Sequence, residues 1–192
     1  WLSRIYDIYN SLCNIFIQKC VALKEIIIKT ASEIIKALGL ERHPGGCDWF
    51  KETYRNETQI ALENFDGPRN ISTCIYNLIT VAHQSQLHKT KSDETVHYYY
   101  GNANLMLYII EQGKLLTIEL GPHNDNLVFQ YHIPKDHWFV VEVKDKTSDA
   151  FVLSGYTVYP GFDFKDFISA DRKVLCEKWP HLSSFISKFT PS

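Results

Sequence analysis

The sequence predicts a mainly β domain, a small barrel or sandwich, with helical segments at both ends. Residues 72–158 form a series of short runs rich in β-branched and aromatic residues, separated by turn residues and without intervening helices. Residues 2–38 and 164–189 instead carry apolar residues at helical spacing. With 192 residues and 45% apolar content, the chain can bury one core but is too short for two ordinary domains.

The N-terminal segment is predicted to be helical because apolar residues recur in steps of three and four from residue 2 to residue 38. Gly39 stands where a left-handed residue ends a helix, and Pro44 prevents continuation. One straight helix of this length would be roughly 55 Å long, so we expect either a break near residues 10–14 or an intermolecular partner. The broad apolar stripe favours docking on the domain or self-association, with contact to a membrane surface as a third option.

Seven runs are predicted to be strands because they are β-rich and bounded by Gly, Pro, Asp or Ser. They are residues 72–80, 96–100, 104–110, 115–120, 127–133, 138–143 and 151–158. The C-terminal segment 164–189 is predicted to form a helical cover, with Phe167, Ala170, Val174 and Leu175 on one face.

Charge and hydropathy exclude several classes of protein. Twenty Lys and Arg residues against 22 Asp and Glu residues give a net charge of −2, which provides no basic field for nucleic acid. Charged residues interrupt every long apolar stretch, so no transmembrane segment is expected. We therefore expect residues 1–39 to be an amphipathic helical extension and residues 40–192 to be the globular domain.

Two sequons, at Asn56 and Asn70, are candidate glycosylation sites and favour a secreted or lumenal protein, with a cytoplasmic one as the alternative. The five cysteines are too few for a disulfide scaffold and lack the spacing of metal-binding knuckles. They are compatible either with buried reduced thiols or with bonds to a partner chain.

A histidine, a glutamate and a glycine follow one another at His88, Glu94 and Gly101. This order resembles the first cupin motif, in which a His and a Glu from adjoining strands point into a small jelly-roll barrel and the glycine makes the next turn. Further matching segments are residues 43–46 (HPGG), 50–54 (FKETY), 72–76 (STCIY), 92–94 (SDE) and 157–167 (TVYPGFDFKDF). They resemble the Cupin 5 family over about residues 31–190. The resemblance implies a cupin-type jelly-roll barrel, the fold of the sugar-nucleotide epimerases, without implying a particular activity.

The resemblance also bears on metal binding. A standard cupin metal site takes two histidines and a glutamate from the first motif and a third histidine from the second. Here Gln86 and Phe139 fall at two of the histidine positions, which leaves His88 and Glu94. Because first-row metals need at least three protein ligands, no metal or other cofactor is predicted; if a divalent metal binds, these two residues are its candidate ligands.

Without a metal, His88 and Glu94 can act as base and acid in one cavity. Metal-independent sugar-nucleotide epimerases use a His base and a Tyr acid. By analogy, an epimerase-like enzyme is a second alternative function; Tyr76, Tyr98 and Tyr100 are candidate acids, with Tyr98 as the candidate third catalytic residue. Unless a bulge shifts the register, strand alternation places residues 96, 98 and 100 on the face of Glu94 and His97 on the other. The alternative is that His88 and Glu94 hydrogen bond one another as a buried polar pair.

The leading functional prediction is a protein that binds a small polar or anionic ligand in the barrel mouth; whether it is an enzyme stays open. The predicted ligand-binding residues are Lys51, Thr53, Tyr76, His88, Glu94 and Phe139. Lys51 stands where the family commonly has an arginine. A guanidinium that could bind an anion through two hydrogen bonds is thus replaced by the compact charge of an ammonium group. The alternative is a secreted structural protein whose N-terminal helix mediates oligomerisation. Both predictions include a homodimer or higher oligomer, because cupins commonly pair through their sheets.

Overall fold

The fold is described from a computed structural model of the chain. It describes residues 30–44, 48–82, 85–122, 128–145 and 147–191. The chain divides into two compact units, residues 1–30 and 31–192, and the fold below is that of the second. The predicted N-terminal helix therefore lies outside the described residues except for its last turns, α2 (Ala31–Leu38).

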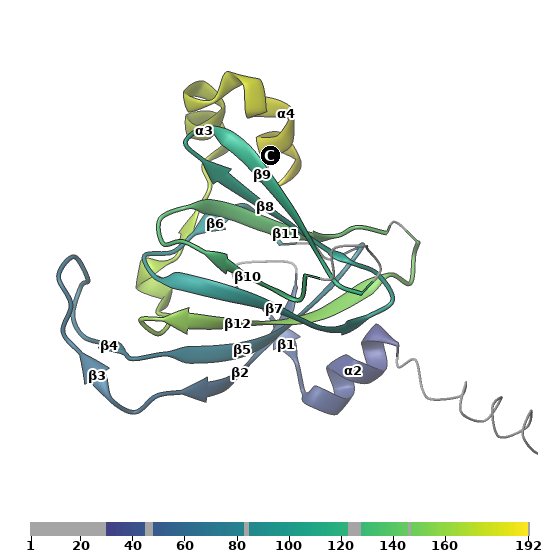
Figure 1. The fold of residues 1–192 in the computed structure, drawn as a ribbon, viewed down its shortest axis with the longest axis horizontal. Helices are drawn as coiled ribbons and strands as arrows, with labels where there is room; N and C mark the ends of the chain where they lie inside the picture. Colours follow the sequence, from purple (N-terminus) through teal and green to yellow (C-terminus); the bar gives the residue numbers. More distant parts are fainter. Residues whose placement is uncertain (1–29, 45–47, 83–84, 123–127, 146, 192) are drawn as a thin grey trace, which may run out of the picture. The chain divides into compact units, whose positions relative to one another are not determined.

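Two antiparallel sheets pack face to face and form the jelly roll (Figure 1). In spatial order, the six-stranded sheet contains β1 (Glu41–Arg42), β2 (Trp49–Arg55), β5 (Thr73–Thr80), β12 (Phe151–Tyr159), β7 (Asp93–Gly101) and β10 (Gln130–Ile133). The five-stranded sheet contains β13 (Ile168–Ser169), β6 (His88–Lys89), β11 (Trp138–Val143), β8 (Leu105–Glu111) and β9 (Lys114–Leu120). A short hairpin pairs β3 (Gln59–Ile60) with β4 (Arg69–Asn70).

All seven predicted strands are present, with ends that differ by at most three residues from the prediction. Their inward-facing side chains form the main core between the sheets, which includes Val96, Leu107, Phe139 and Val152. The cupin-type all-β fold is therefore confirmed. Strand β2 was not predicted because most of its side chains are exposed and polar, which removes the alternation that marks a half-buried strand.

A bulge in β7 changes which face its residues occupy. Tyr98 pairs with Ser154 and Tyr100 pairs with Leu153, so Tyr99 is the extra residue. Glu94, Val96 and Tyr98 are buried on the inner face, as alternation predicted. Tyr100 is the exception: it packs in the cluster outside the six-stranded sheet. The prediction that residue 100 shares the face of Glu94 is wrong because the bulge shifts the alternation by one residue.

Helix α2 covers the outer face of the six-stranded sheet, where Ile34 packs in a cluster with Leu78 and Phe151 (Figure 1). The helix ends at Leu38 as predicted, and Gly39 has a φ of 63°, which a glycine adopts without strain. None of the helices within the described ranges is long and apolar enough to cross a bilayer.

The C-terminal segment covers the five-stranded sheet, as predicted, with several short elements in place of one continuous helix. It contains η1 (Phe164–Asp166), β13, α3 (Arg172–Lys178), η2 (Pro180–Leu182) and α4 (Ser183–Lys188). The break after α3 coincides with Pro180. Proline has no backbone N–H, so it cannot donate the hydrogen bond that would continue the helix. Ala170 and Leu175 are buried in the cluster beneath these helices, whereas Val174 is 57% exposed and does not share their face.

Candidate functional site

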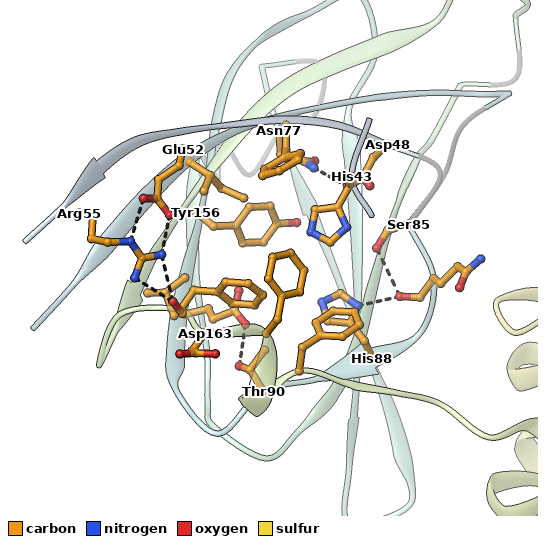
Figure 2. A pocket seen from close by; sticks show the side chains of 18 residues that line it. His43, Asp48, Glu52, Arg55, Asn77, Ser85, His88, Thr90, Tyr156 and Asp163 are labelled. Atoms are coloured by element: carbon orange, nitrogen blue, oxygen red, sulfur yellow. Dashed lines mark hydrogen bonds and ion pairs between the residues drawn. The ribbon is translucent and has the colours of Figure 1, made fainter. Parts of the chain in front are cut away.

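A cavity of about 350 Å³ lies inside the barrel, lined by β2, β5, β6, β7, β12 and the segment 162–167 (Figure 2). Its described lining includes two histidines, four carboxylic acids, one arginine, one tyrosine and four phenylalanines. The cavity thus has the size and mixed polar and aromatic lining of a small-molecule site.

His88 projects into the cavity from β6, and Phe139 lies opposite it on β11 with ring centroids 4.3 Å apart. Nδ1 lies 2.7 Å from the carbonyl oxygen of Gln86. Because a carbonyl only accepts, Nδ1 carries the proton and Nε2 is left as an acceptor when the ring is neutral. Removal of the ring from bulk water lowers the pKa of His88 to about 4, so the imidazole is neutral near pH 7.

Glu94 projects from β7 and is 5% exposed. The Thr90 hydroxyl donates a hydrogen bond of 2.7 Å to Oε1 and lies 3.0 Å from the Ser92 carbonyl oxygen. Burial raises the pKa of Glu94 to about 7, and the hydrogen bond from Thr90 opposes this shift. The carboxyl group is therefore close to half-protonated at neutral pH.

His88 and Glu94 line the same cavity but do not form the buried hydrogen-bonded pair that was one alternative. Among the described residues, their hydrogen-bond partners are the Gln86 carbonyl and the Thr90 hydroxyl. Each therefore keeps a polar atom directed at the cavity: Nε2 of His88 and Oε2 of Glu94.

Tyr156 reaches the cavity from β12 and is 7% exposed, with its hydroxyl directed among the lining side chains (Figure 2). Within the described ranges, this hydroxyl has no hydrogen-bond partner. Desolvation, followed by the charges of Glu94 and Asp48, raises the pKa of Tyr156 well above its usual value. Tyr156 is therefore a neutral phenol that can donate or accept a hydrogen bond.

Asp48 and Asn77 form a second polar group on the cavity wall. The Asn77 side-chain amide donates to Asp48 Oδ2, and the Ser154 hydroxyl donates to the Asn77 side-chain oxygen at 3.3 Å. All three residues are buried. Asp48 is thus held by a neutral partner rather than by a cation.

Glu52 and Arg55 form a bidentate ion pair in the cavity lining, with N···O distances of 2.8 and 2.6 Å. Arg55 also donates to the Asn70 side-chain oxygen at 2.9 Å and to the Phe162 carbonyl oxygen at 3.1 Å. The hydrogen bonds to Glu52 raise the pKa of Arg55 further. This arginine is occupied by protein acceptors.

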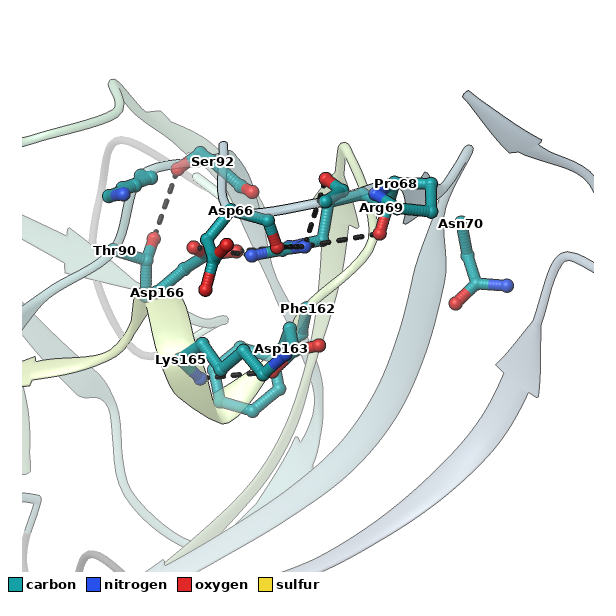
Figure 3. A network of polar contacts seen from close by, with 12 residues as sticks. Asp66, Pro68, Arg69, Asn70, Thr90, Ser92, Phe162, Asp163, Lys165 and Asp166 are labelled. Carbon is teal, nitrogen blue, oxygen red and sulfur yellow. Dashed lines mark hydrogen bonds and ion pairs between the residues drawn. The ribbon is translucent and has the colours of Figure 1, made fainter. Parts of the chain in front are cut away.

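The aromatic wall of the cavity comes from the segment 162–167, which a buried ion pair holds in place (Figure 3). Arg69 Nε donates to Asp166 Oδ2 at 2.6 Å and Nη2 donates to Oδ1 at 3.0 Å; both side chains are 3% exposed. Arg69 Nη1 also donates to the Asp66 carbonyl oxygen at 2.8 Å. At Gly161, a Cβ would lie 3.0 Å from Thr73 Cγ2, so a side chain there would force its neighbours to shift.

Of the predicted site residues, His88 and Glu94 line the cavity and five others do not. Lys51 and Tyr76 face the outside of the six-stranded sheet: the Lys51 ammonium donates to the Leu38 carbonyl oxygen at 2.8 Å, and Tyr76 packs in the α2 cluster. Thr53 is exposed and donates to the Cys74 carbonyl oxygen at 3.2 Å. Strand alternation accounts for Lys51 and Tyr76, because each lies between two cavity-facing neighbours.

The remaining two predicted site residues that do not line the cavity are Tyr98 and Phe139. Both lie in the main core. The Tyr98 hydroxyl donates to the Ala103 carbonyl oxygen at 3.0 Å, near the turn after β7. Burial raises the pKa of Tyr98 to about 12. Tyr98 therefore has no route to the cavity as a proton donor, and Phe139 supports the His88 ring from behind.

Sequence reasoning did not single out Tyr156, Asp48 or Arg55. Tyr156 lies two residues before Val158 in a predicted strand, so alternation alone places both on one face, and both line the cavity. Asp48 and Arg55 lie just before and just after the FKETY segment, which marked this region but not these positions.

The described residues do not fit a cupin-type metal centre. His88 Nε2 and Glu94 supply two donors, and the described ranges contain no group of three His, Cys, Asp or Glu side chains able to hold a metal ion. Phe139 packs against His88 where a further ligand would be needed.

The candidate glycosylation sites lie near the β3–β4 hairpin. The Asn56 amide nitrogen donates to the Tyr54 hydroxyl at 2.8 Å, and the Asn70 amide nitrogen donates to the Asn56 carbonyl oxygen at 2.6 Å. Cys74 and Cys176 are free thiols; the other three cysteines lie outside the described residues. Glycosylation and the secretory compartment stay predictions.

The two-sheet jelly roll and the interior cavity with His88 and Glu94 define the class as a cupin. The family described as "Cupin superfamily (DUF985)", Cupin_5, matches residues 32–170, well over half of the chain, and the chain belongs to this family.

Two solved structures are similar over most of the chain. One is a hypothetical protein from Leishmania major, with a TM-score of 0.76 and 26% identity over 85% of this chain and 100% of that one. The other is a protein from Shewanella oneidensis, with a TM-score of 0.74 and 29% identity over 85% of this chain and 99% of that one. No curated protein matched the chain.

Proposed function

We propose that the chain binds a small polar organic molecule in the cavity inside its barrel. The observation that supports this most is a set of three polar atoms that line the cavity without a hydrogen-bond partner among the described residues: His88 Nε2, Glu94 Oε2 and the Tyr156 hydroxyl. Buried polar groups are normally satisfied, so a ligand or water completes these three.

The geometry supports the polar part of the original prediction more than the anionic part. Anion binding depended on Lys51, whose ammonium group contacts the Leu38 carbonyl oxygen on the outside of the sheet. The one arginine in the described lining is already paired with Glu52. The proposed ligand is therefore polar, and it needs no negative charge.

Protein-detected NMR with a set of small alcohols, amides, amines and carboxylates tests the proposal. Binding fragments should shift the signals of residues 156 and 162–167, and Glu94→Gln should weaken their binding. Glu119→Gln is the matched control because Glu119, on β9, lies outside the cavity and forms an ion pair with Lys144. If fragments bind without affecting cavity signals, or if none binds, the proposal is wrong.

Proton transfer is a second candidate function, favoured by the neutral His88 and by the pKa of Glu94 near 7 in one cavity. His88 Nε2 would take a proton from a carbon next to a carbonyl, and Glu94 or Tyr156 would protonate the carbonyl oxygen. Tyr156 replaces Tyr98 in this hypothesis. Solvent deuterium incorporation into a panel of keto sugars would support it, and equal incorporation by His88→Gln, which lacks the proposed base, would contradict it.

A further inference from the structure

We infer that the ligand of this cavity is a small organic cation, with a primary ammonium or amidinium group on a compact apolar body. The inference rests on the proposed function, because it assigns a chemical class to the ligand of the same site. It is carried by three features of the cavity: its charge, its hydrogen-bonding groups and its aromatic wall.

The described lining has an excess of negative charge. Asp48, Glu52, Glu94 and Asp163 face a single arginine, and that arginine forms its bidentate pair with Glu52. The remaining three carboxyl groups are held by neutral donors: the Asn77 amide, the Thr90 hydroxyl and the Lys165 backbone N–H. Asp163 also interacts electrostatically with Arg55 and Arg69, so a bound cation would mainly neutralise the charges of Asp48 and Glu94.

The available polar atoms are mainly acceptors. His88 uses its N–H for the Gln86 carbonyl, so Nε2 can only accept, and Glu94 Oε2 accepts when ionised. Glu94 and Tyr156 are both more than nine-tenths buried, and each directs a polar atom without a described partner at the cavity. A group with several N–H donors satisfies such a site, whereas a carboxylate or phosphate would bring more acceptors.

Aromatic rings form the rest of the cavity. The His43 ring contacts Phe50, Phe164 and Phe167 at centroid distances of 4.9, 5.9 and 6.2 Å. Phe167 also stacks on His88 at 4.9 Å. Such rings bury an apolar ligand body and attract a cation through their faces. Aromatic faces together with unpaired carboxylates are a combination suited to organic cations.

Three ligands of nearly equal shape test the charge: benzylammonium, benzyl alcohol and benzoate. Binding to the full chain is measured by calorimetry at about pH 8, where Glu94 is mostly ionised. We expect benzylammonium to bind at least about tenfold more tightly than benzyl alcohol, and benzoate to bind most weakly. Equal or tighter binding of benzyl alcohol or benzoate overturns the inference but leaves the proposed function standing.

Two variants locate the effect. Asp163→Asn removes a charge while asparagine can still cap η1, so the variant should fold and bind benzylammonium several-fold more weakly, with benzyl alcohol unaffected. Phe164→Leu removes an aromatic face at a residue that is 52% exposed, and it should weaken benzylammonium more than benzyl alcohol. Phe129→Leu, at an exposed phenylalanine outside the cavity, is the control. Unchanged preference for the cation in both cavity variants contradicts the inference.

Discussion

Burial shifts the two titratable groups at the centre of the cavity in opposite senses. It raises the pKa of Glu94 to about 7 and lowers the pKa of His88 to about 4. The folded state therefore retains the Glu94 proton up to a higher pH than the unfolded state does, and it disfavours protonation of His88. As a result, the two contributions to stability change in opposite directions between about pH 4.5 and 6.5.

Replacing Glu94 separates its contribution to the pH dependence of stability from that of His88. Because the folded pKa is raised, Glu94 makes the free energy of unfolding fall as pH rises from about 4.5 to above 7. Glu94→Gln removes this loss, so the variant should match the native chain near pH 5 and exceed it by roughly 3 kcal/mol at about pH 8. Urea unfolding at the two pH values measures the difference. A difference that does not change with pH would contradict the assignment.

The same residues show what the sequence could reveal about the site. His88 and Glu94 were predicted because the order of a His, a Glu and a Gly in one short stretch resembles a known motif. Tyr156 lies 62 positions beyond Glu94 and reaches the cavity only because β12 pairs with β7, a register that one-dimensional patterns do not encode. Tyr98 was on the predicted face but too far along the strand, where its hydroxyl meets the turn that follows.

At the scale of elements, the Arg69–Asp166 pair connects the β3–β4 hairpin to the aromatic cavity wall (Figure 3). Arg69→Met leaves Asp166 buried without its cation, so we expect a loss of roughly 3–5 kcal/mol in the free energy of unfolding. The double variant Arg69→Met with Asp166→Leu should recover part of that loss, because no buried charge is then left alone. Denaturant titration of both variants measures these values.

An exposed pair provides the comparison. Lys144 and Glu119 lie 2.7 Å apart with the lysine side chain 54% exposed, and Lys144→Met should cost less than about 1 kcal/mol. A comparable cost for Arg69→Met would show that the buried pair does not brace the wall.

The C-terminal helices offer a test of which face covers the sheet. Ile186 on α4 is fully buried in the cluster beneath the helices, whereas Val174 on α3 is 57% exposed. Ile186→Ala should cost about 2–5 kcal/mol and Val174→Ala less than about 0.5 kcal/mol, measured by urea unfolding. Similar costs at both positions would contradict the orientation of α3.

The same elements show where periodicity succeeds and fails. β11 was predicted with its observed ends because it is buried from Phe139 to Val143, with the core on one side and the C-terminal cover on the other. In the C-terminal segment, apolar spacing predicted correctly that the segment covers the sheet. It could not reveal that short turns and a two-residue strand interrupt the helix. Apolar spacing reports burial, and several backbone conformations can satisfy it.

At the scale of the whole molecule, residues 31–192 contain three apolar clusters of their own, between the sheets and on both outer faces. We therefore expect a chain that begins at residue 30 to fold, with a thermal transition and β-sheet circular dichroism like those of the full chain. Loss of the transition would mean that the first residues complete the core. Sedimentation of both chains tests the predicted homodimer and the assembly role of the N-terminal segment: larger species should disappear on truncation if that role is real.

The fold class was predictable because the seven strands and the apolar patterns that flank them each carry a local signal, and the motif resemblance joined them into one topology. The cavity was less predictable. It forms where β2, β5, β6, β7 and β12 converge, and the pairing of β5 with β12 joins residues about 80 positions apart in the sequence.

The braced wall of the cavity also has a kinetic consequence. Asp166 is fixed by Arg69, and the Gly161 backbone N–H is held 2.7 Å from the Asn70 carbonyl oxygen, before any ligand arrives. If the cavity binds a ligand as proposed, binding requires no slow ordering of this segment, so the association rate should be limited by diffusion and orientation. Substitutions in the wall that preserve the Arg69–Asp166 ion pair should change the dissociation rate of the ligand far more than its association rate.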